Sequence, residues 1–375
     1  MIENKIGALP AQYIRKMFSE SEILNSDEKN IQPASIDLSV SKEGYRMRGT
    51  FLPKKSESIR DIIKSESIYK IDLDNPLEKN GVYLIKLNEE LNLSKEKFAF
   101  TSSKSSIGRI DLQTRLVVDG YSRFDGVPCG YKGELWLQII PKSFLIKLNV
   151  GDKLTQIRFF NGEAKINNGE ITKVYEKYKL LFDKSQNFIP SEEGLAQNNR
   201  NNIVMTIELG GENDNQVIGY KNLLVDQVVD LSKINYYNAD EFFEPIISPK
   251  NGKLILEKDS FYIFYTKEFI RIPNEFSSEM IAYDISNGEF RSHYAGFFDP
   301  GFGYGQNGEI KGRQAVLEVR SYDSNLVFRD GQPICQMSFE NLIEQTEFVY
   351  GLEIGSNYVN QNGPKLSKYF KSEVK

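Results

Sequence analysis

Residues 151–159 read GDKLTQIRF, and residues 331–339 read GQPICQMSF. Both stretches follow the pattern Gly-x-x-aliphatic-x-Gln-x-x-Phe, at an offset of 180 residues. The same offset aligns GELWLQI (133–139) with RQAVLEV (313–319), and a slightly different one aligns GVYLIKLNEELNL (81–93) with SFYIFYTKEFIRI (260–272). Three matches in the same order predict a duplicated domain.

The matched segments have the composition of β-strands. Aromatic and β-branched residues alternate with polar ones, and Gly, Pro and Asn interrupt them about every 8–12 residues. In GELWLQI, Trp136 and Gln138 share one face of the expected strand, whereas Leu135 and Leu137 share the other. One helix is expected near residues 10–18, because proline is favoured in a first helical turn. The sequence therefore predicts an all-β chain with a few short helices.

The length of 375 residues favours two domains. Residues 184–202 (KSQNFIPSEEGLAQNNRNN) are polar and aperiodic, so the linker is expected there. This places a first domain at residues 1–183 and a second at 203–350. The remaining residues, 351–375, form a polar tail that we expect to be mobile.

Composition narrows the possible classes of function. The net charge of −5 argues against broad, sequence-independent binding of nucleic acid, which needs a basic face. No run approaches the roughly 18–20 apolar residues of a membrane helix, and the first residues lack the apolar stretch of a signal peptide. Two cysteines, Cys129 and Cys335, fit a reducing compartment. A cytoplasmic protein, with no membrane or nucleic-acid partner, is therefore expected.

The histidine and cysteine content bears on zinc chemistry. His293 is the only histidine, and no Cys-x-x-Cys pair occurs. Zinc deaminases need a His/Cys/Cys or three-Cys site that includes such a pair. If this chain is a hydrolase acting on a base, side chains alone must therefore activate its water.

Residues 104–109, KSSIGR, are the sharpest local signal for chemistry, and we call them the serine loop. They follow an apolar, strand-like stretch and can open a helical turn. Two hydroxyls, a lysine and an arginine offer donors to phosphate oxygens. Ser105 and Arg109 would share one face of a helical turn. By composition alone, the favoured alternative is a serine helix cap with solvated charges.

Several segments, in this order, resemble the dUTPase and dCTP deaminase superfamily. IQPASIDLSV (31–40) resembles its amino-terminal motif, and the serine loop resembles its phosphate-binding box. HYAGFFDPGFG (293–303) resembles a hairpin that carries a sugar-contacting aspartate, here Asp299. As a whole, the chain resembles the long, two-domain bacterial dCTP deaminases. This resemblance implies two tandem dUTPase-like (β-clip) domains.

The resemblance also implies zinc-free deamination by one glutamate on a strand. The matching position is Glu318, and its duplicate in the first half is Gln138. An amide cannot accept a proton from water at neutral pH, so the first half lacks this base. Ser105 and Arg109 are implied to hold the water and to position the base. The alternative for Glu318 is a carboxylate on the surface of a strand, paired with Arg320.

The second half shows the reverse loss. YDISNGEFRSHYAG (283–296) stands where the serine loop would be repeated, without its double serine. In the superfamily, active sites form between neighbouring subunits. Complementary loss therefore predicts one composite kind of site, with the serine loop from the first half and Glu318 and Asp299 from the second.

The resemblance further implies a set of substrate contacts and a lid. The expected contacts are Lys104, Ser106, Arg115, Ala295, Asp299, His293, Tyr358, Gln361, Lys365 and Lys368. The last four belong to SNYVNQNGPKLSKYF (356–370), which resembles the superfamily's C-terminal lid; the alternative is a disordered basic tail. For His293, the alternative is a structural role in a hairpin. Magnesium is expected with the substrate triphosphate, because Mg²⁺ prefers phosphate oxygens and water to a protein cage.

Three functions remain open at this point. The first is a dCTP deaminase, which converts dCTP to dUTP and ammonia for dUMP and dTMP supply. The second is a dUTPase or a bifunctional enzyme, although the tail lacks the Gly-rich motif of dUTPases. The third is a non-catalytic nucleotide-binding protein. A homo-oligomer is expected, with three two-domain chains as one solution, and relatives suggest dTTP as an inhibitor.

Overall fold

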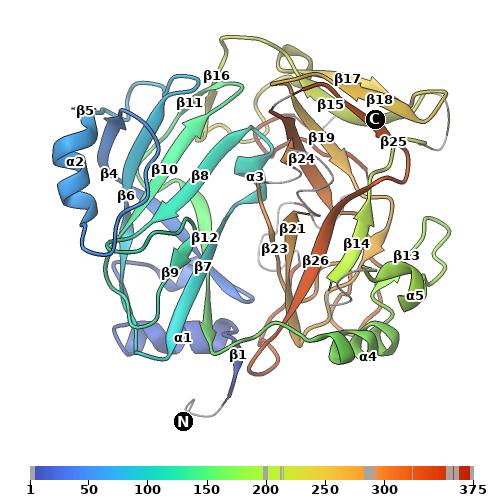
Figure 1. Cartoon of the computed structure of the whole chain (residues 1–375), viewed down its shortest axis with the longest axis horizontal. Coiled ribbons are helices and arrows are strands. Elements are labelled where there is room, and N and C mark those ends of the chain that lie inside the picture. Colours follow the sequence, from blue (N-terminus) through green and yellow to red (C-terminus); the bar gives the residue numbers. More distant parts are fainter. Residues whose placement is uncertain are drawn as a thin grey trace. The chain divides into compact units, whose positions relative to one another are not determined.

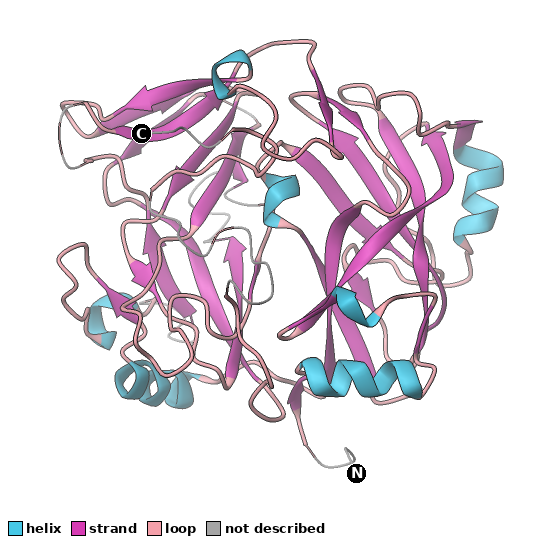
Figure 2. Ribbon diagram, turned by 180° about the vertical axis from the view of Figure 1, so that it is seen from behind, coloured by secondary structure: helices cyan, strands magenta, loops and turns pink. Residues whose placement is uncertain are grey.

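The structure is a computed structural model that describes residues 5–196, 202–211, 213, 215–282, 290–291, 294–322, 324–351, 358 and 363–371. The chain is mostly β, as predicted, and its helices are short (Figure 2). Its contacts divide it into two compact units. The first contains Met1–Glu163, Leu224–Tyr237 and Ser367–Lys375, and the second contains Ala164–Leu223 and Asn238–Leu366.

The first unit is built on one large antiparallel sheet (Figure 1). Its strands are β1 (Gly7–Ala8), β2 (Ile23–Leu24), β3 (Ile31–Gln32), β4 (Ser35–Met47), β5 (Ser67–Lys70), β6 (Val82–Asn92), β7 (Lys97–Ser103), β8 (Leu112–Val117), β9 (Gly126–Val127), β10 (Lys132–Pro141) and β12 (Lys153–Asn161). The main path runs β8-β10-β6-β4-β12-β7-β9, and the shorter strands pair at its sides. A separate parallel pair joins β11 (Leu145–Lys147) to β16 (Val228–Asp230).

Short helices cover parts of this sheet. They are α1 (Ala11–Ser19), η1 (Glu28–Asn30), α2 (Ile59–Glu66) and α3 (Ser105–Gly108). As predicted, α1 begins directly after a proline, Pro10, and it buries Ile14 and Met17. At the start of α2, the Ser58 hydroxyl accepts the Asp61 N–H at 3.1 Å, which is a typical helix cap.

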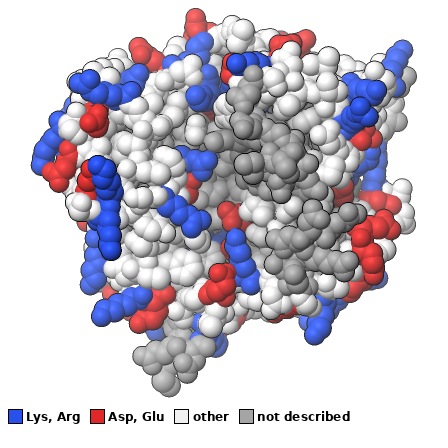
Figure 3. Space-filling view, in the orientation of Figure 1, with Lys and Arg blue, Asp and Glu red and all other residues white. Residues whose placement is uncertain are grey.

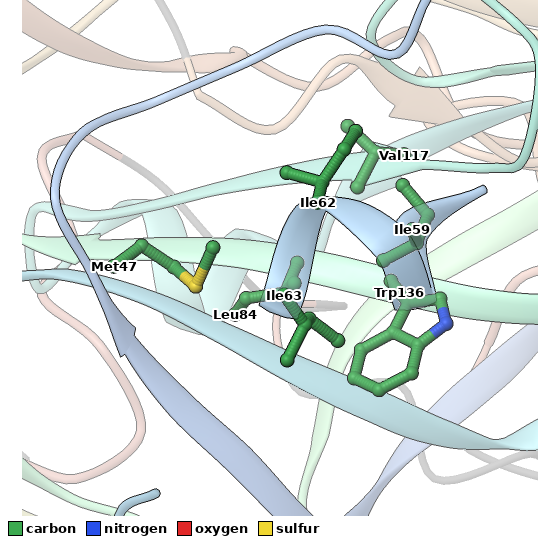
Figure 4. Close-up of a cluster of buried hydrophobic side chains, with 7 residues drawn as sticks. All are labelled: Met47, Ile59, Ile62, Ile63, Leu84, Val117 and Trp136. Atoms are coloured by element: carbon green, nitrogen blue, oxygen red, sulfur yellow. The ribbon is translucent and has the colours of Figure 1, made fainter. Parts of the chain in front are cut away.

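Helix α2 is held by apolar packing against the sheet. One face of the helix packs against side chains from β4, β6, β8 and β10 (Figure 4). The cluster consists of Met47, Ile59, Ile62, Ile63, Leu84, Val117 and Trp136. Burial of an aliphatic side chain of this size contributes about 1.5–3 kcal/mol. The cluster therefore fixes β10, the strand that carries Gln138.

The second unit contains several smaller sheets. Its strands are β13 (Leu181–Phe182), β14 (Asn202–Thr206), β15 (Val217–Asn222), β17 (Phe243–Ile247), β18 (Lys253–Leu256), β19 (Phe261–Tyr265), β20 (Phe269–Ile270), β21 (Phe276–Ala282), β22 (Phe290–Arg291), β23 (Phe297–Phe298), β24 (Val316–Ser321), β25 (Leu326–Arg329) and β26 (Pro333–Asn341). Its helices are α4 (Asn168–Tyr178), α5 (Ser191–Gly194) and η2 (Ala239–Glu241). The two largest sheets run β14-β26-β21-β23 and β17-β15-β19-β24-β22.

Strand pairings repeat between the units at the positions where the sequence repeats. In the first unit β12 lies between β4 and β7, and in the second unit β26 lies between β14 and β21. Likewise, β10 pairs with β6, and β24 pairs with β19. The repeated GDKLTQIRF and GQPICQMSF segments lead into β12 and β26, which have equal lengths. Each repeated sequence therefore forms the same set of strand neighbours.

The boundaries of the units differ from the expected domains. The first unit ends at Glu163 rather than at residue 183, and much of the expected linker packs within the second unit. Helix α5 lies in that stretch, and the Tyr175 hydroxyl donates to the Ile189 carbonyl at 3.0 Å. The reason is that two apolar residues, Phe188 and Ile189, interrupt the polar run; the ring of Phe188 lies 5.9 Å from that of Tyr175.

Two segments return to the first unit from far along the sequence. They are Leu224–Tyr237 and Ser367–Lys375. In the described part of the latter, Ser367, Tyr369 and Phe370 are all buried. These three residues of the expected tail are therefore packed rather than exposed to water.

Candidate functional site

The serine loop forms a short helical turn directly after β7. Helix α3 spans Ser105–Gly108, Lys104 precedes it, and Arg109 follows it. The Arg109 N–H donates to the Ser105 carbonyl at 3.1 Å, so the two side chains share one face, as predicted. Ser105 is half-buried, whereas Ser106 and Arg109 are 3% and 4% exposed. Arg109 is therefore not a solvated charge, as the alternative based on composition expected.

Lys104 is held by a carboxylate that the sequence prediction did not assign to the site. Its ammonium forms an ion pair with Asp37 of β4, which is 4% exposed. The other carboxylate oxygen of Asp37 is buried and has no hydrogen-bond partner. The signal was available, because Asp37 is the aspartate of the quoted IQPASIDLSV motif.

Lys368 is another cation of this neighbourhood. It lies in the segment that returns to the first unit. Burial lowers the pKa of Lys368, and the positive charge of Lys104 lowers it further, against the opposing charges of Asp37 and Asp152. The charge of Lys104 therefore acts on Lys368.

Arg115 and Gln138 face each other across neighbouring strands. They are directly paired in the register of β8 and β10. Arg115 forms an ion pair with Asp125, whose carboxylate also accepts the Leu116 N–H at 2.9 Å. Gln138 is 1% exposed. Its side chain accepts the Phe51 N–H at 3.2 Å and donates to the Phe51 carbonyl at 2.6 Å.

Glu318 occupies the matching position of the second unit, on β24, and is 2% exposed. One carboxylate oxygen accepts two backbone N–H groups, from Tyr294 at 2.8 Å and from Ala295 at 3.1 Å. Arg320, two residues along, donates to the Asp259 carbonyl. Glu318 is therefore buried against the hairpin that carries Ala295, and it is not the surface carboxylate of the alternative reading.

The hairpin continues to Asp299, which follows β23. The Phe302 N–H donates to the Asp299 carbonyl at 3.1 Å, and the Gly301 N–H donates to the Ile272 carbonyl at 2.9 Å. The structure thus brings Ala295 and Glu318 into contact and places Asp299 a few residues further along the same hairpin. All three residues belong to the second unit.

For the remaining predicted contacts, the structure gives only burial or no description. Tyr358 is 8% exposed and Lys365 is half-buried. His293 and Gln361 lie outside the described residues. Among the residues that the structure does describe, no cluster of three or more His, Cys, Asp or Glu side chains is arranged to hold a metal ion.

The molecular face shown in Figure 3 carries charges of both signs. Lysines and arginines alternate with acidic residues over the face shown in Figure 3. This agrees with the small net charge of −5. None of the helices within the described ranges has the length and apolarity that crossing a membrane requires.

These observations define a class of protein: a mostly β chain of two units, with a serine loop in one and a buried strand glutamate in the other. Comparisons with known families agree. Residues 5–163 match the 2'-deoxycytidine 5'-triphosphate deaminase N-terminal domain, and residues 169–370 match the C-terminal domain of the same family. The chain belongs to the two-domain 2'-deoxycytidine 5'-triphosphate deaminase family.

A solved structure gives the same result. The 2'-deoxycytidine 5'-triphosphate deaminase from Agrobacterium tumefaciens is 34% identical, with a TM-score of 0.82. The match covers 92% of this chain and 100% of the other. A variant of Bacillus subtilis oxalate decarboxylase is 10% identical over 84% of this chain and 80% of its own, but its TM-score of 0.11 carries no argument about fold. A search of curated proteins gave no match.

Proposed function

We propose that this protein is a dCTP deaminase that hydrolyses the C4 amino group of dCTP to give dUTP and ammonia. One observation carries the proposal: a buried strand carboxylate, Glu318, lies against the backbone of the hairpin residues Tyr294 and Ala295. Membership of the family supports dCTP as the substrate.

In the proposed mechanism, Glu318 takes a proton from the attacking water and later delivers a proton to the leaving amine. One of its oxygens accepts two backbone N–H groups, which fixes the orientation of the carboxylate for this transfer. General acid–base catalysis of this kind contributes about 10²–10⁴ in rate. Water adds to C4, the C4–N bond breaks, and the amine leaves as ammonia.

The serine loop has the complementary task in this proposal. Lys104 and Ser106 bind phosphate oxygens, while Ser105 and Arg109 hold the water and orient the base. The other proposed substrate contacts are Arg115, Asp299, Tyr358, Gln361, Lys365, Lys368 and His293. Mg²⁺ would be carried by the triphosphate oxygens, and it would shield their charge. Within the two-domain chain, the first half thus contributes phosphate binding and the second half contributes proton transfer.

The test is to incubate the protein with dCTP and Mg²⁺ and to resolve the nucleotides by chromatography. We expect dUTP and ammonia in equal amounts, with no loss of rate when a zinc chelator is added. Appearance of dUMP from dCTP would make the enzyme bifunctional. Turnover of dUTP without turnover of dCTP would contradict the proposal, and so would binding of dCTP without any turnover.

A further inference from the structure

A described segment late in the sequence is an integral part of the first unit. Residues 367–371, which we call the brace, lie alongside residues 235–237. The N–H groups of Asn235 and Tyr236 donate to the carbonyls of Lys368 and Tyr369, at 2.8 and 2.9 Å. In return, the Lys371 N–H donates to the Tyr237 carbonyl at 2.8 Å. The brace thus both accepts backbone hydrogen bonds from residues 235–237 and donates one back to them.

The partner of the brace is itself fixed to the body of the first unit. Strand β16, a few residues upstream, pairs in parallel with β11. The Asp230 N–H donates to the Tyr237 hydroxyl at 2.8 Å, and the ring of Tyr237 lies 6.3 Å from that of Phe370. A continuous set of contacts therefore leads from β11, through Tyr237, to the brace.

The brace contacts the serine loop through Ser367. The Ser367 hydroxyl donates to the Ser106 carbonyl at 2.7 Å, across 261 positions of sequence. Both residues are almost fully buried, at 2% and 3% exposed. Helix α3 has only four residues, and the N–H groups of Ile107, Gly108 and Arg109 close its turn. The Ser106 carbonyl accepts the Ser367 hydroxyl instead, so this buried external bond adds to the bonds that fix the loop.

We infer that Ser367 is a positioning residue, which holds the serine loop in its anion-binding conformation by anchoring the Ser106 carbonyl to the brace. The inference rests on the proposed role of the serine loop in binding phosphate. Ser367 acts through Ser106 and touches no substrate in this scheme.

The position of Lys368 supports the inference. It follows Ser367 directly, so the same bond that orients the loop also places this ammonium in the field of Lys104. Both lysines are half-buried, and a bound anion relieves the repulsion between two like charges. A displaced brace would therefore weaken anion binding in two ways, through the loop conformation and through the loss of the second cation.

The experiment compares Ser367→Ala with Ser248→Ala in the full chain. Ser248 is a matched control, because its buried hydroxyl also contacts backbone carbonyls, those of Gly210 at 2.6 Å and Leu209 at 3.0 Å, but in the second unit. Calorimetry with inorganic triphosphate measures anion binding without any turnover. We expect Ser367→Ala to weaken binding about three- to tenfold, and Ser367→Thr, which keeps the hydroxyl, to restore it. Ser248→Ala should leave binding unchanged.

Two further readouts separate positioning from general stability. Amide hydrogen exchange in Ser367→Ala should quicken at residues 104–109 and stay unchanged in β24 of the second unit. Tyr237→Phe, which loosens the brace at a different point, should give the same pattern with a smaller effect. In kinetics with dCTP, KM should rise more than kcat falls.

Equal triphosphate affinity in Ser367→Ala and the wild type would overturn the inference, as would uniform loss of exchange protection across both units. These outcomes differ from failure of the proposed function. A protein that binds triphosphate through the brace-dependent loop, but releases no ammonia from dCTP, would contradict the deaminase proposal and leave the inference standing.

Discussion

Gln138 and Glu318 occupy the same position of two repeated strands, yet their side chains form different hydrogen bonds. The Gln138 amide both accepts and donates, so it binds the N–H and the carbonyl of Phe51. Glu318 can only accept when ionised, and it accepts two N–H groups from the hairpin at Tyr294 and Ala295. Both side chains are buried. The comparison teaches that a single change from carboxylate to amide converts a proposed proton-transfer site into a structural anchor.

The largest effect is expected from Glu318→Gln. The amide oxygen can still accept both N–H groups, so the fold is kept, but the side chain can no longer take a proton from water. We expect kcat for dCTP to fall about 10²–10⁴-fold, measured by ammonia release. Gln138→Ala serves as the control and should retain much of the activity per folded molecule. Equal losses in the two variants would contradict the division of labour between the halves.

Gln138→Glu is expected to destabilise the first unit without creating a second base. The introduced carboxylate cannot donate to the Phe51 carbonyl, which is left without this partner in a buried site. We expect the free energy of unfolding to fall by about 1–3 kcal/mol, as urea denaturation would measure. Combined with Glu318→Gln, the change should not restore deamination. Recovery of turnover in that double variant would show that either strand can supply the base.

A smaller effect is expected from two buried glutamates, one in each unit, that have the same kind of hydrogen-bond partners. Glu89 accepts the N–H and hydroxyl of Ser39, and Glu268 accepts those of Thr206. Burial raises the pKa of both glutamates above the ordinary value of 4.5. The folded state therefore binds their protons more tightly than the unfolded state. Their contribution to stability is full below pH 4.5 and is lost as pH rises through the raised values.

Glu89→Gln and Glu268→Gln should accordingly raise the midpoint of thermal unfolding at pH 7 relative to the wild type, with little gain at pH 4.5. Glu134→Gln is the opposite control. Although burial opposes its ionisation, hydrogen bonds from Arg60 and Lys86 lower the pKa of Glu134 to about 2, so its loss should destabilise the protein at pH 7. Scanning calorimetry across pH 4–8 measures all three. A midpoint that falls in both buried variants would contradict the prediction.

Much of the site could be predicted from sequence, because it depends on local patterns. The helical turn of the serine loop follows from the order of residues 104–109, and α1 follows from Pro10. The exchange of glutamine for glutamate is visible once the repeats are aligned. The polar composition of residues 184–202 does not indicate that Phe188 and Ile189 attach this stretch to the second unit.

By itself, the sequence determined the strand content, the duplication and the exchange between Gln138 and Glu318. These features are periodic or local, so neighbouring residues are sufficient to encode them. Only the tertiary structure decided that Asp37 pairs with Lys104, that Glu318 lies against Tyr294 and Ala295, and that the brace anchors Ser106. Such contacts join residues distant along the chain, and they form only when the strands between them pack, so no local pattern marks them in advance.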